Sequence, residues 1–263
     1  SGTEDKFIEA WTPPDQKTDQ SPAQLWRSIS RNIQNSRPEE SLQAQFISIC
    51  LENTDIHVHR LATSYEKQLT QALLVGISPN KPFQNSVDVE IAASVHDFFT
   101  SLGTALDHLA CLIAKRLSKP KSTDDMTKLV RSSTSDDFSH DPMLNWFLET
   151  SNVSLGVKSY VLEGQIKEFR ALRRRFVHHR PYGAGPTEAF GQLRLAVCSG
   201  DLSVLVYERH MDSGNGSTFE LLDKVRQYYL FSVMLFCDLA RLSGYACEMP
   251  VLHIEELNNF SNQ

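Results

Sequence analysis

The sequence lacks the short motifs that identify most nucleotide-dependent and metal-dependent enzymes. It contains no P-loop, no G-x-G-x-x-G dinucleotide fingerprint, no G-x-S-x-G nucleophile motif and no H-E-x-x-H zinc motif. His57 and His59 lie two residues apart in a predicted helix. Their side chains then point to different sides and cannot bind one metal ion together. We therefore expect neither a metal ion nor another cofactor.

Cysteine is scarce and widely spaced. The chain has five cysteines in 263 residues, and no two of them stand in the C-x-x-C spacing of zinc and redox sites. An odd number of distant cysteines also argues against a disulfide framework. The five are Cys50, Cys111, Cys198, Cys237 and Cys247. This usage predicts reduced thiols in a cytoplasmic protein.

Long hydrophobic runs are also missing. The longest apolar run, 228–239, is interrupted by Asp238 and is too short to span a bilayer. Residues 1–5 lead into a polar segment, so we expect no cleavable signal peptide and no membrane association. The formal net charge of −6 argues against a surface built for non-specific binding to nucleic acid. Any binding to RNA would need a local basic patch.

Helical periodicity is present over most of the chain. The strongest signal is in 87–118, where apolar residues recur at steps of three and four. These residues are Val95, Phe99, Leu102, Leu106, Leu109 and Ile113. Other helices are predicted at 21–35 with a Ser21-Pro22 start, at 38–76, after Asp141-Pro142, at 158–179, and from Ser217 or Thr218 to about 245. The polar stretch 119–139 is predicted to be a loop with at most one short helical turn.

The apolar positions of the predicted helix 38–76 also follow helical spacing. They are Leu42, Phe46, Ile49, Ile56, Leu69 and Leu73.

The periodicity changes from helical to alternating in 192–207. Leu193, Leu195 and Val197 alternate with other residues before the turn 199–201, and the alternation resumes after it. This pattern predicts a β-hairpin. The fold class is therefore mainly α, an antiparallel bundle of four or more helices with a small β-hairpin inserted before the last long helix. We expect a flexible arm at 1–20, a single helical domain at 21–250 and a tail at 251–263.

One segment of this acidic chain is strongly basic. Between 164 and 181 there are six positive charges, Lys167 and Arg170, Arg173, Arg174, Arg175 and Arg180, against the one negative charge of Glu168. Such a run is often just a solvated helix face. At 100° per residue, however, Arg173 falls on the apolar face of the helix. A guanidinium group there is costly to desolvate unless it meets a carboxylate or lies at a polar cleft.

The apolar face that includes Arg173 is formed by Leu162, Ile166, Phe169 and Phe176. On a straight helix His178 lies about 140° around from Arg173. The two side chains can then only line different walls of one groove, or meet across a dimer.

The sequence Arg173-Arg174-Arg175-Phe176-Val177-His178 resembles the R-x4-H motif of HEPN domains (higher eukaryotes and prokaryotes nucleotide-binding). The pair Arg174 and His179 gives a second register with the same spacing, but it misplaces the apolar pair. The helix that carries Asp107 is similar to the acidic-residue helix of many bacterial HEPN proteins. Two positions depart from the pattern, because the polar residue after the first arginine is itself Arg174, and Arg180 stands where some HEPN toxins have tyrosine.

The resemblance implies metal-independent RNA cleavage, usually by a homodimer whose two motifs face one cleft. His178 would be the general acid and base, Arg173 would hold the scissile phosphate, and Asp107 would orient Arg173. The residues expected to bind the RNA backbone are Arg170, Arg174, Arg175, His179 and Arg180. The implied context is a toxin or anti-phage system, with a protein antitoxin or defence partner. The alternative is a non-catalytic helical module that binds a nucleotide or a protein.

Overall fold

The computed structural model describes residues 21–179, 190–197, 203–212 and 218–247. The expected arm at 1–20 and the tail at 251–263 lie outside these residues, as do Cys198 and the predicted turn at 199–201. The other four cysteines are free thiols.

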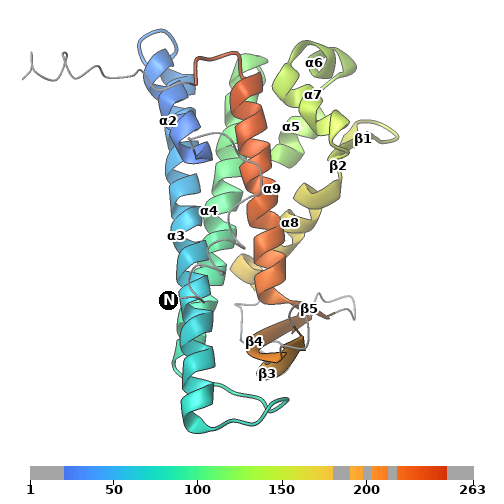
Figure 1. Cartoon of the computed structure of the whole chain (residues 1–263). Coiled ribbons are helices and arrows are strands. Elements are labelled where there is room, and N and C mark those ends of the chain that lie inside the picture. Colours follow the sequence, from blue (N-terminus) through green and yellow to red (C-terminus); the bar gives the residue numbers. More distant parts are fainter. Residues whose placement is uncertain (1–20, 180–189, 198–202, 213–217, 248–263) are drawn as a thin grey trace, which may run out of the picture.

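Four long helices form the bundle, which confirms the mainly-α fold (Figure 1). They are α2 (Pro22–Ile33), α3 (Pro38–Val75), α4 (Val87–Arg116) and α9 (Leu221–Leu242). Helices α3 and α4 are antiparallel, because Glu39 pairs with Lys115 at one end and Lys67 pairs with Glu90 at the other. Helix α2 contacts α3 and α9, and Trp26 Nε1 donates a hydrogen bond to the Phe236 carbonyl oxygen.

The predicted helix starts follow from local capping. Ser21 forms a capping box with Gln24, and Pro22 occupies the first turn of α2. Helix α3 is continuous to Val75 and ends at Gly76. The φ of Gly76 is 74°, the left-handed conformation that glycine adopts readily at the C-terminal end of a helix. Asp141 caps α7 (Pro142–Glu149), where Trp146 and Phe147 are buried.

The prediction of a loop over 119–139 is wrong. This segment contains two short helices, α5 (Met126–Ser132) and α6 (Ser135–His140). Asp125 caps α5 by accepting from two backbone N–H groups, and Thr134 forms a capping box with Asp137. Each helix also buries apolar side chains, including Leu129 and Phe138. Helix caps and a few core contacts therefore stabilise helices in this segment despite its polar composition.

The predicted helix 158–179 starts later than expected. Strands β1 (Val153–Leu155) and β2 (Tyr160–Leu162) form an antiparallel pair, and α8 begins at Gly164 and ends at Arg174. Leu162 is buried as predicted, but it reaches the core from a strand. The last turn of the helical segment is the π-helix η1 (Arg175–His179).

The alternating segment forms a hairpin, as predicted. Strands β3 (Phe190–Val197) and β4 (Ser203–Asp212) are antiparallel, with Leu195 opposite Leu205. A third strand, β5 (Thr218–Glu220), pairs with β4. The last helix therefore begins at Leu221 with Glu220 as its cap, and the predicted cap at Ser217 or Thr218 is wrong.

A buried polar network joins this sheet to the bundle. Arg209 is 1% exposed, and its Nη2 donates to Asp88 Oδ1 on α4 at 2.6 Å. Glu220 Oε1 accepts from the Arg209 backbone N–H and from the Tyr65 hydroxyl, both at 3.3 Å. Burial raises the pKa of Glu220 to about 7, against the opposing effect of these hydrogen bonds.

The raised pKa of Glu220 predicts a pH-dependent stability. The folded state binds this proton more tightly than the unfolded state, so stability falls as pH rises from about 4.5 to about 7. The loss is on the order of 3 kcal/mol. Urea unfolding at several pH values should show that Glu220→Gln removes this part of the pH dependence. The exposed Glu66→Gln on α3 should retain it, and identical profiles for the parent and Glu220→Gln would contradict the assignment.

Candidate functional site at the end of helix α8

Arg173 on α8 reaches across to α4. Its Nη1 donates a hydrogen bond to Asp107 Oδ2 at 2.8 Å. The side chains are 22% and 28% exposed, so the pair lies at the edge of the core and touches solvent. The sequence predicted that a guanidinium group on the apolar face would need a carboxylate or a polar cleft, and the structure pairs it with the carboxylate of Asp107.

Gly103 provides the space that Arg173 occupies. A Cβ atom on Gly103 would lie 2.4 Å from both Cδ and Nε of Arg173, and 2.6 Å from its Cζ. Only a residue without a side chain fits under the guanidinium group in this position. Gly103 was not among the site residues predicted from the sequence. The available signal was a glycine four residues before Asp107, inside the strongest predicted helix, where glycine costs stability without a packing reason.

Arg170 extends the ion pair into a chain of four charges. Its Nη1 lies 3.5 Å from Asp107 Oδ1, and its Nη2 lies 3.3 Å from Asp125 Oδ1. Asp125 is also the cap of α5. Two arginines and two aspartates thus link α8 to α4 and α5 with no net charge. Arg170, expected to bind substrate, is placed here between two carboxylates.

The environment of Asp107 is partly desolvated. Burial raises the pKa of Asp107, while the hydrogen bond and charge of Arg173 and the charge of Arg170 oppose this rise. Arg173 Nε is buried and has no hydrogen-bond acceptor among the described residues. Among the described residues, the hydrogen bond of the Arg173 guanidinium group is the one that Nη1 donates to Asp107, which holds the side chain against α4.

The chain changes from α-helix to π-helix directly after the arginine pair. Phe176 in η1 is buried and packs against Phe99 at a ring distance of 5.2 Å, which anchors this turn. Single π-helical turns occur frequently at functional sites. Their i→i+5 hydrogen bonds widen the turn, so the 140° separation of a straight helix does not apply to Arg173 and His178. The side chains of His178 and His179, and all of Arg180, lie outside the described part of the chain.

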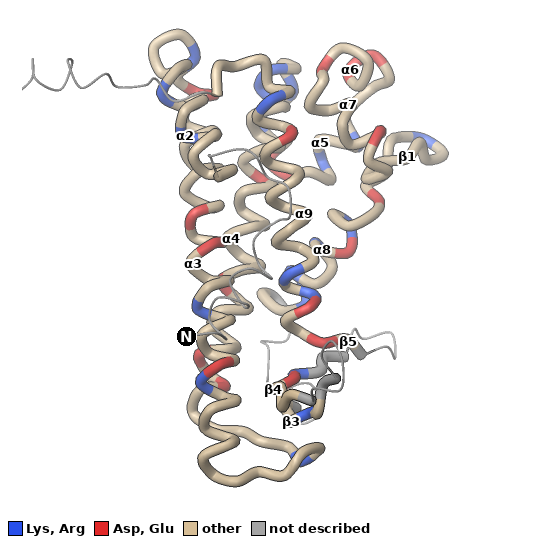
Figure 2. The backbone as a smooth tube through the Cα atoms, in the orientation of Figure 1, with Lys and Arg blue, Asp and Glu red and all other residues tan. Residues whose placement is uncertain are grey.

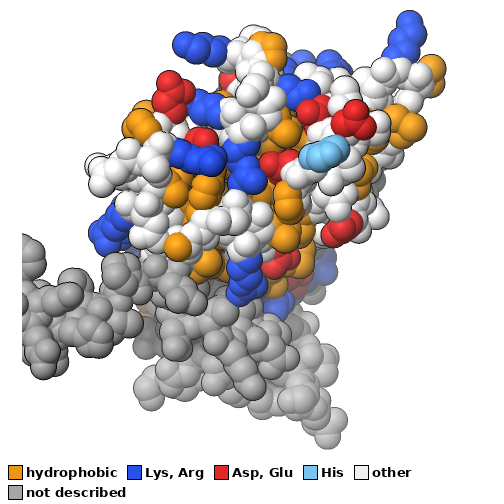
Figure 3. All heavy atoms as spheres, turned by 90° about the horizontal axis from the view of Figure 1, so that it is seen from above, with side chains coloured by type: hydrophobic (Ala, Val, Ile, Leu, Met, Phe, Trp, Pro, Cys, Tyr) orange, Lys and Arg blue, Asp and Glu red, His pale blue; other side chains and the backbone are white. Residues whose placement is uncertain are grey.

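The remaining basic residues of the predicted site differ in exposure. Arg174 is exposed and Arg175 is half-buried. Acidic and basic positions are otherwise intermixed along the described helices of the bundle (Figure 2). The view along the bundle from above likewise shows charges of both signs around apolar side chains (Figure 3).

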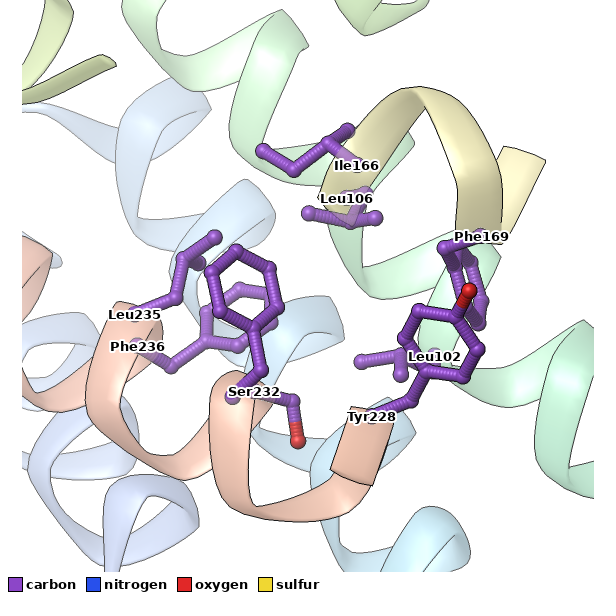
Figure 4. Close-up of a pocket in the computed structure, with 9 residues that line it drawn as sticks. Leu102, Leu106, Ile166, Phe169, Tyr228, Ser232, Leu235 and Phe236 are labelled. Carbon is purple, nitrogen blue, oxygen red and sulfur yellow. The ribbon is translucent and has the colours of Figure 1, made fainter. Parts of the chain in front are cut away.

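A narrow apolar pocket lies next to this site, between α4, α8 and α9 (Figure 4). Leu106, Ile166 and Phe236 are among the residues that line it. It has room for about one water molecule, which is far too little for a nucleotide. A ligand of the Arg173 site would thus bind at the surface.

His108 follows Asp107 but belongs to a different contact. Its Nδ1 lies 2.9 Å from Gln43 Oε1, its ring stacks on Phe46 of α3, and burial lowers its pKa. These contacts give His108 a packing role. Among the described residues there is no group of three or more His, Cys, Asp or Glu side chains arranged to hold a metal ion.

No protein-family model, curated protein or solved structure matches the chain. None of its described helices is both long enough and apolar enough to cross a membrane. The assignment of a function therefore depends on the geometry of the site and on the motif.

Proposed function

We propose that this chain is a metal-independent endoribonuclease of the HEPN type, acting in the cytoplasm within a toxin–antitoxin or anti-phage system. The observation that carries the proposal is the placement of Arg173 over Gly103, paired with Asp107 at the edge of the core. A guanidinium group that is fixed in position and remains partly exposed to solvent is suited to bind a phosphodiester. It also occupies the first position of the R-x4-H motif, whose last residue follows in η1.

The proposed reaction needs no group other than the RNA and this chain. The ribose 2′-oxygen attacks the adjacent phosphorus as His178 removes the 2′-hydroxyl proton. The bond from phosphorus to the 5′-oxygen breaks, and a proton from the imidazole is returned to that oxygen. The products are a 2′,3′-cyclic phosphate and a 5′-hydroxyl end. Arg173 offsets the negative charge on the phosphoryl oxygens in the transition state, and Asp107 positions Arg173.

The second candidate function is a non-catalytic module that binds an anionic ligand or a protein. The charge balance of the cluster favours it, because Asp107 and Asp125 neutralise Arg170 and Arg173. In this second function the four charges would only hold α8, α4 and α5 together. In that case Arg174 and Arg175 would contact the partner without any chemistry.

Cleavage of single-stranded RNA in EDTA separates the two functions. The parent protein should cut the RNA, and His178→Ala and Arg173→Ala should each lose about 100-fold or more in rate. The matched control is His140→Ala, an exposed histidine on α6, which should cleave like the parent. The fragments should carry 2′,3′-cyclic phosphate ends.

Two results would overturn the nuclease proposal. Intact RNA at high concentrations of the parent protein favours the binding module. Equal cleavage by the parent and His178→Ala shows that the activity comes from a contaminant or another site.

A further inference from the structure

Arg170 lies between two carboxylates that come from different elements of the fold. Asp107 is on α4, and Asp125 is the N-cap of α5, which packs on the same side of α4 as α8 (Figure 1). The two terminal nitrogens of Arg170 reach one carboxylate each, at 3.5 Å and 3.3 Å. A guanidinium group can bridge two acids in this way because its nitrogens are held in one rigid plane. The Arg170 side chain is 27% exposed, so most of it faces protein rather than solvent.

We propose that Arg170 and Asp125 are positioning residues of the Arg173 site. Asp125 fixes Arg170, Arg170 fixes Asp107, and Asp107 fixes Arg173. This role differs from the RNA contact that the HEPN resemblance implies for Arg170. The effect on cleavage rests on the proposed function, whereas the effect of Arg170 on Asp107 does not.

The contact between Arg170 and Asp107 is shielded from water. Arg170 Nη1 and Asp107 Oδ1 are both buried, and neither has a hydrogen-bond partner among the described residues. Opposite charges 3.5 Å apart attract each other more strongly there than at an exposed surface, because water does not screen them. Arg173 holds the other carboxylate oxygen, Oδ2. With a cation at each oxygen, the Asp107 carboxylate can rotate only by losing one of the two contacts.

Asp125 is itself held in a fixed position. Its Oδ1 accepts hydrogen bonds from two backbone N–H groups in the first turn of α5, at 2.7 Å and 3.0 Å. The same helix is anchored in the core by Met126 and Leu129, which are fully buried. Asp125 Oδ1 also lies 3.3 Å from Arg170 Nη2. Arg170 is thereby tied to a fixed point that belongs to neither α4 nor α8.

The charge state of Asp107 depends on Arg170 as well. Burial is the main cause of the raised pKa of Asp107; the hydrogen bond and charge of Arg173 and the charge of Arg170 lower it, and Asp125 raises it. Without Arg170 the pKa of Asp107 would rise further. A protonated Asp107 is a weaker acceptor for Arg173 than a carboxylate is. Arg170 therefore supports the ion pair through both the geometry and the charge of Asp107.

Steady-state kinetics of RNA cleavage separate positioning from RNA binding at Arg170. Arg170→Ala should lower kcat by about 10-fold or more with little change in KM, because the RNA contacts remain and the placement of Arg173 is lost. Arg170→Lys should be nearly as slow, since one ammonium group cannot bridge two carboxylates. The control is Lys167→Ala, an exposed cation on the same helix, which should cleave like the parent. A raised KM with an unchanged kcat, or full activity of Arg170→Lys, would assign Arg170 to RNA binding and overturn the proposal.

Asp125→Asn tests the outer residue without removing the helix cap. Asparagine caps helices about as well as aspartate, so α5 should remain intact while the negative charge that faces Arg170 is lost. Circular dichroism should show the parental helix content, and kcat should fall by about 3-fold, the effect of one partly exposed ion pair. An unchanged kcat would contradict the role of Asp125.

NMR titration of the Asp107 carboxyl carbon tests the same contact without RNA. In Arg170→Ala, Asp107 should titrate at a higher pH than in the parent, and in Lys167→Ala it should titrate at the parental pH. An unchanged titration in Arg170→Ala would refute the proposal, whatever the RNA assay shows. A shifted titration in a protein that leaves RNA intact would remove the nuclease and retain Arg170 as the residue that positions Asp107.

Discussion

Replacing Gly103 with alanine is expected to slow RNA cleavage by on the order of 100-fold while the fold remains intact. The new Cβ would lie 2.4 Å from two atoms of Arg173, so that side chain must leave its position and its hydrogen bond to Asp107. The helix itself tolerates alanine better than glycine by about 1 kcal/mol, which offsets part of the lost ion pair. Cleavage rate and Tm should be measured on the same preparations.

The control for Gly103→Ala is Thr104→Ala at the next position of α4. Thr104 is half-buried, and its hydroxyl donates to the Thr100 carbonyl oxygen of its own helix. This variant should cleave RNA like the parent. If Gly103→Ala also cleaves at the parental rate, the placement of Arg173 against α4 has no part in the reaction. Such a result would count against Asp107 as a positioning residue as well.

The elements that could be predicted from the sequence are those specified by interactions between residues close together in the chain. The apolar repeat of α4 predicted the helix, and Phe99, Leu102 and Leu106 are buried as expected. The caps at Ser21 and Asp141 also predicted their helices, because a cap acts within three or four residues.

Elements that depend on distant contacts were harder to predict. The short helices α5 and α6 are polar in composition and are held by caps and by a few buried residues. Strand β5 forms by pairing with β4, a contact that the residues near the start of α9 do not reveal. The start of α9 was therefore predicted too early. On α3, Leu42 and Ile49 are exposed whereas Ile47 is buried, and all three fit a helical repeat, so periodicity alone cannot tell which row faces the core.

In the candidate site, too, features set by neighbouring residues could be predicted, whereas those set by distant contacts could not. The apolar face around Arg173 implied that this residue meets a carboxylate or a polar cleft, and Asp107 is its partner. Asp125 could not be foreseen as a partner of Arg170, because their contact requires the packing of α5 beside α8. The π-helical turn after Arg174 was not foreseen either, since an α-helical repeat was assumed through to residue 179.

Replacing Arg209 with alanine is expected to cost about 3–5 kcal/mol of stability, because it leaves the Asp88 carboxylate without its buried counter-ion. The carboxylate would retain hydrogen bonds from Gln68 Nε2 at 2.9 Å and from the Asn85 backbone N–H at 3.0 Å. These neutral donors offset only part of the cost of a partly buried charge. Urea unfolding gives the free-energy difference directly.

The same sheet provides a matched control in Arg194→Ala. Arg194 pairs with Glu208 at 3.1 Å, but its side chain is exposed, and exposed pairs contribute at most about 1 kcal/mol. A loss from Arg209→Ala no larger than that of the control would mean that the sheet is not anchored to α4 through this pair. Adding Asp88→Asn to Arg209→Ala removes the unpaired charge, so the double variant should recover part of the lost stability. Recovery would show that the cost comes from the unpaired carboxylate, whereas the absence of recovery would assign it to the packing of the arginine side chain.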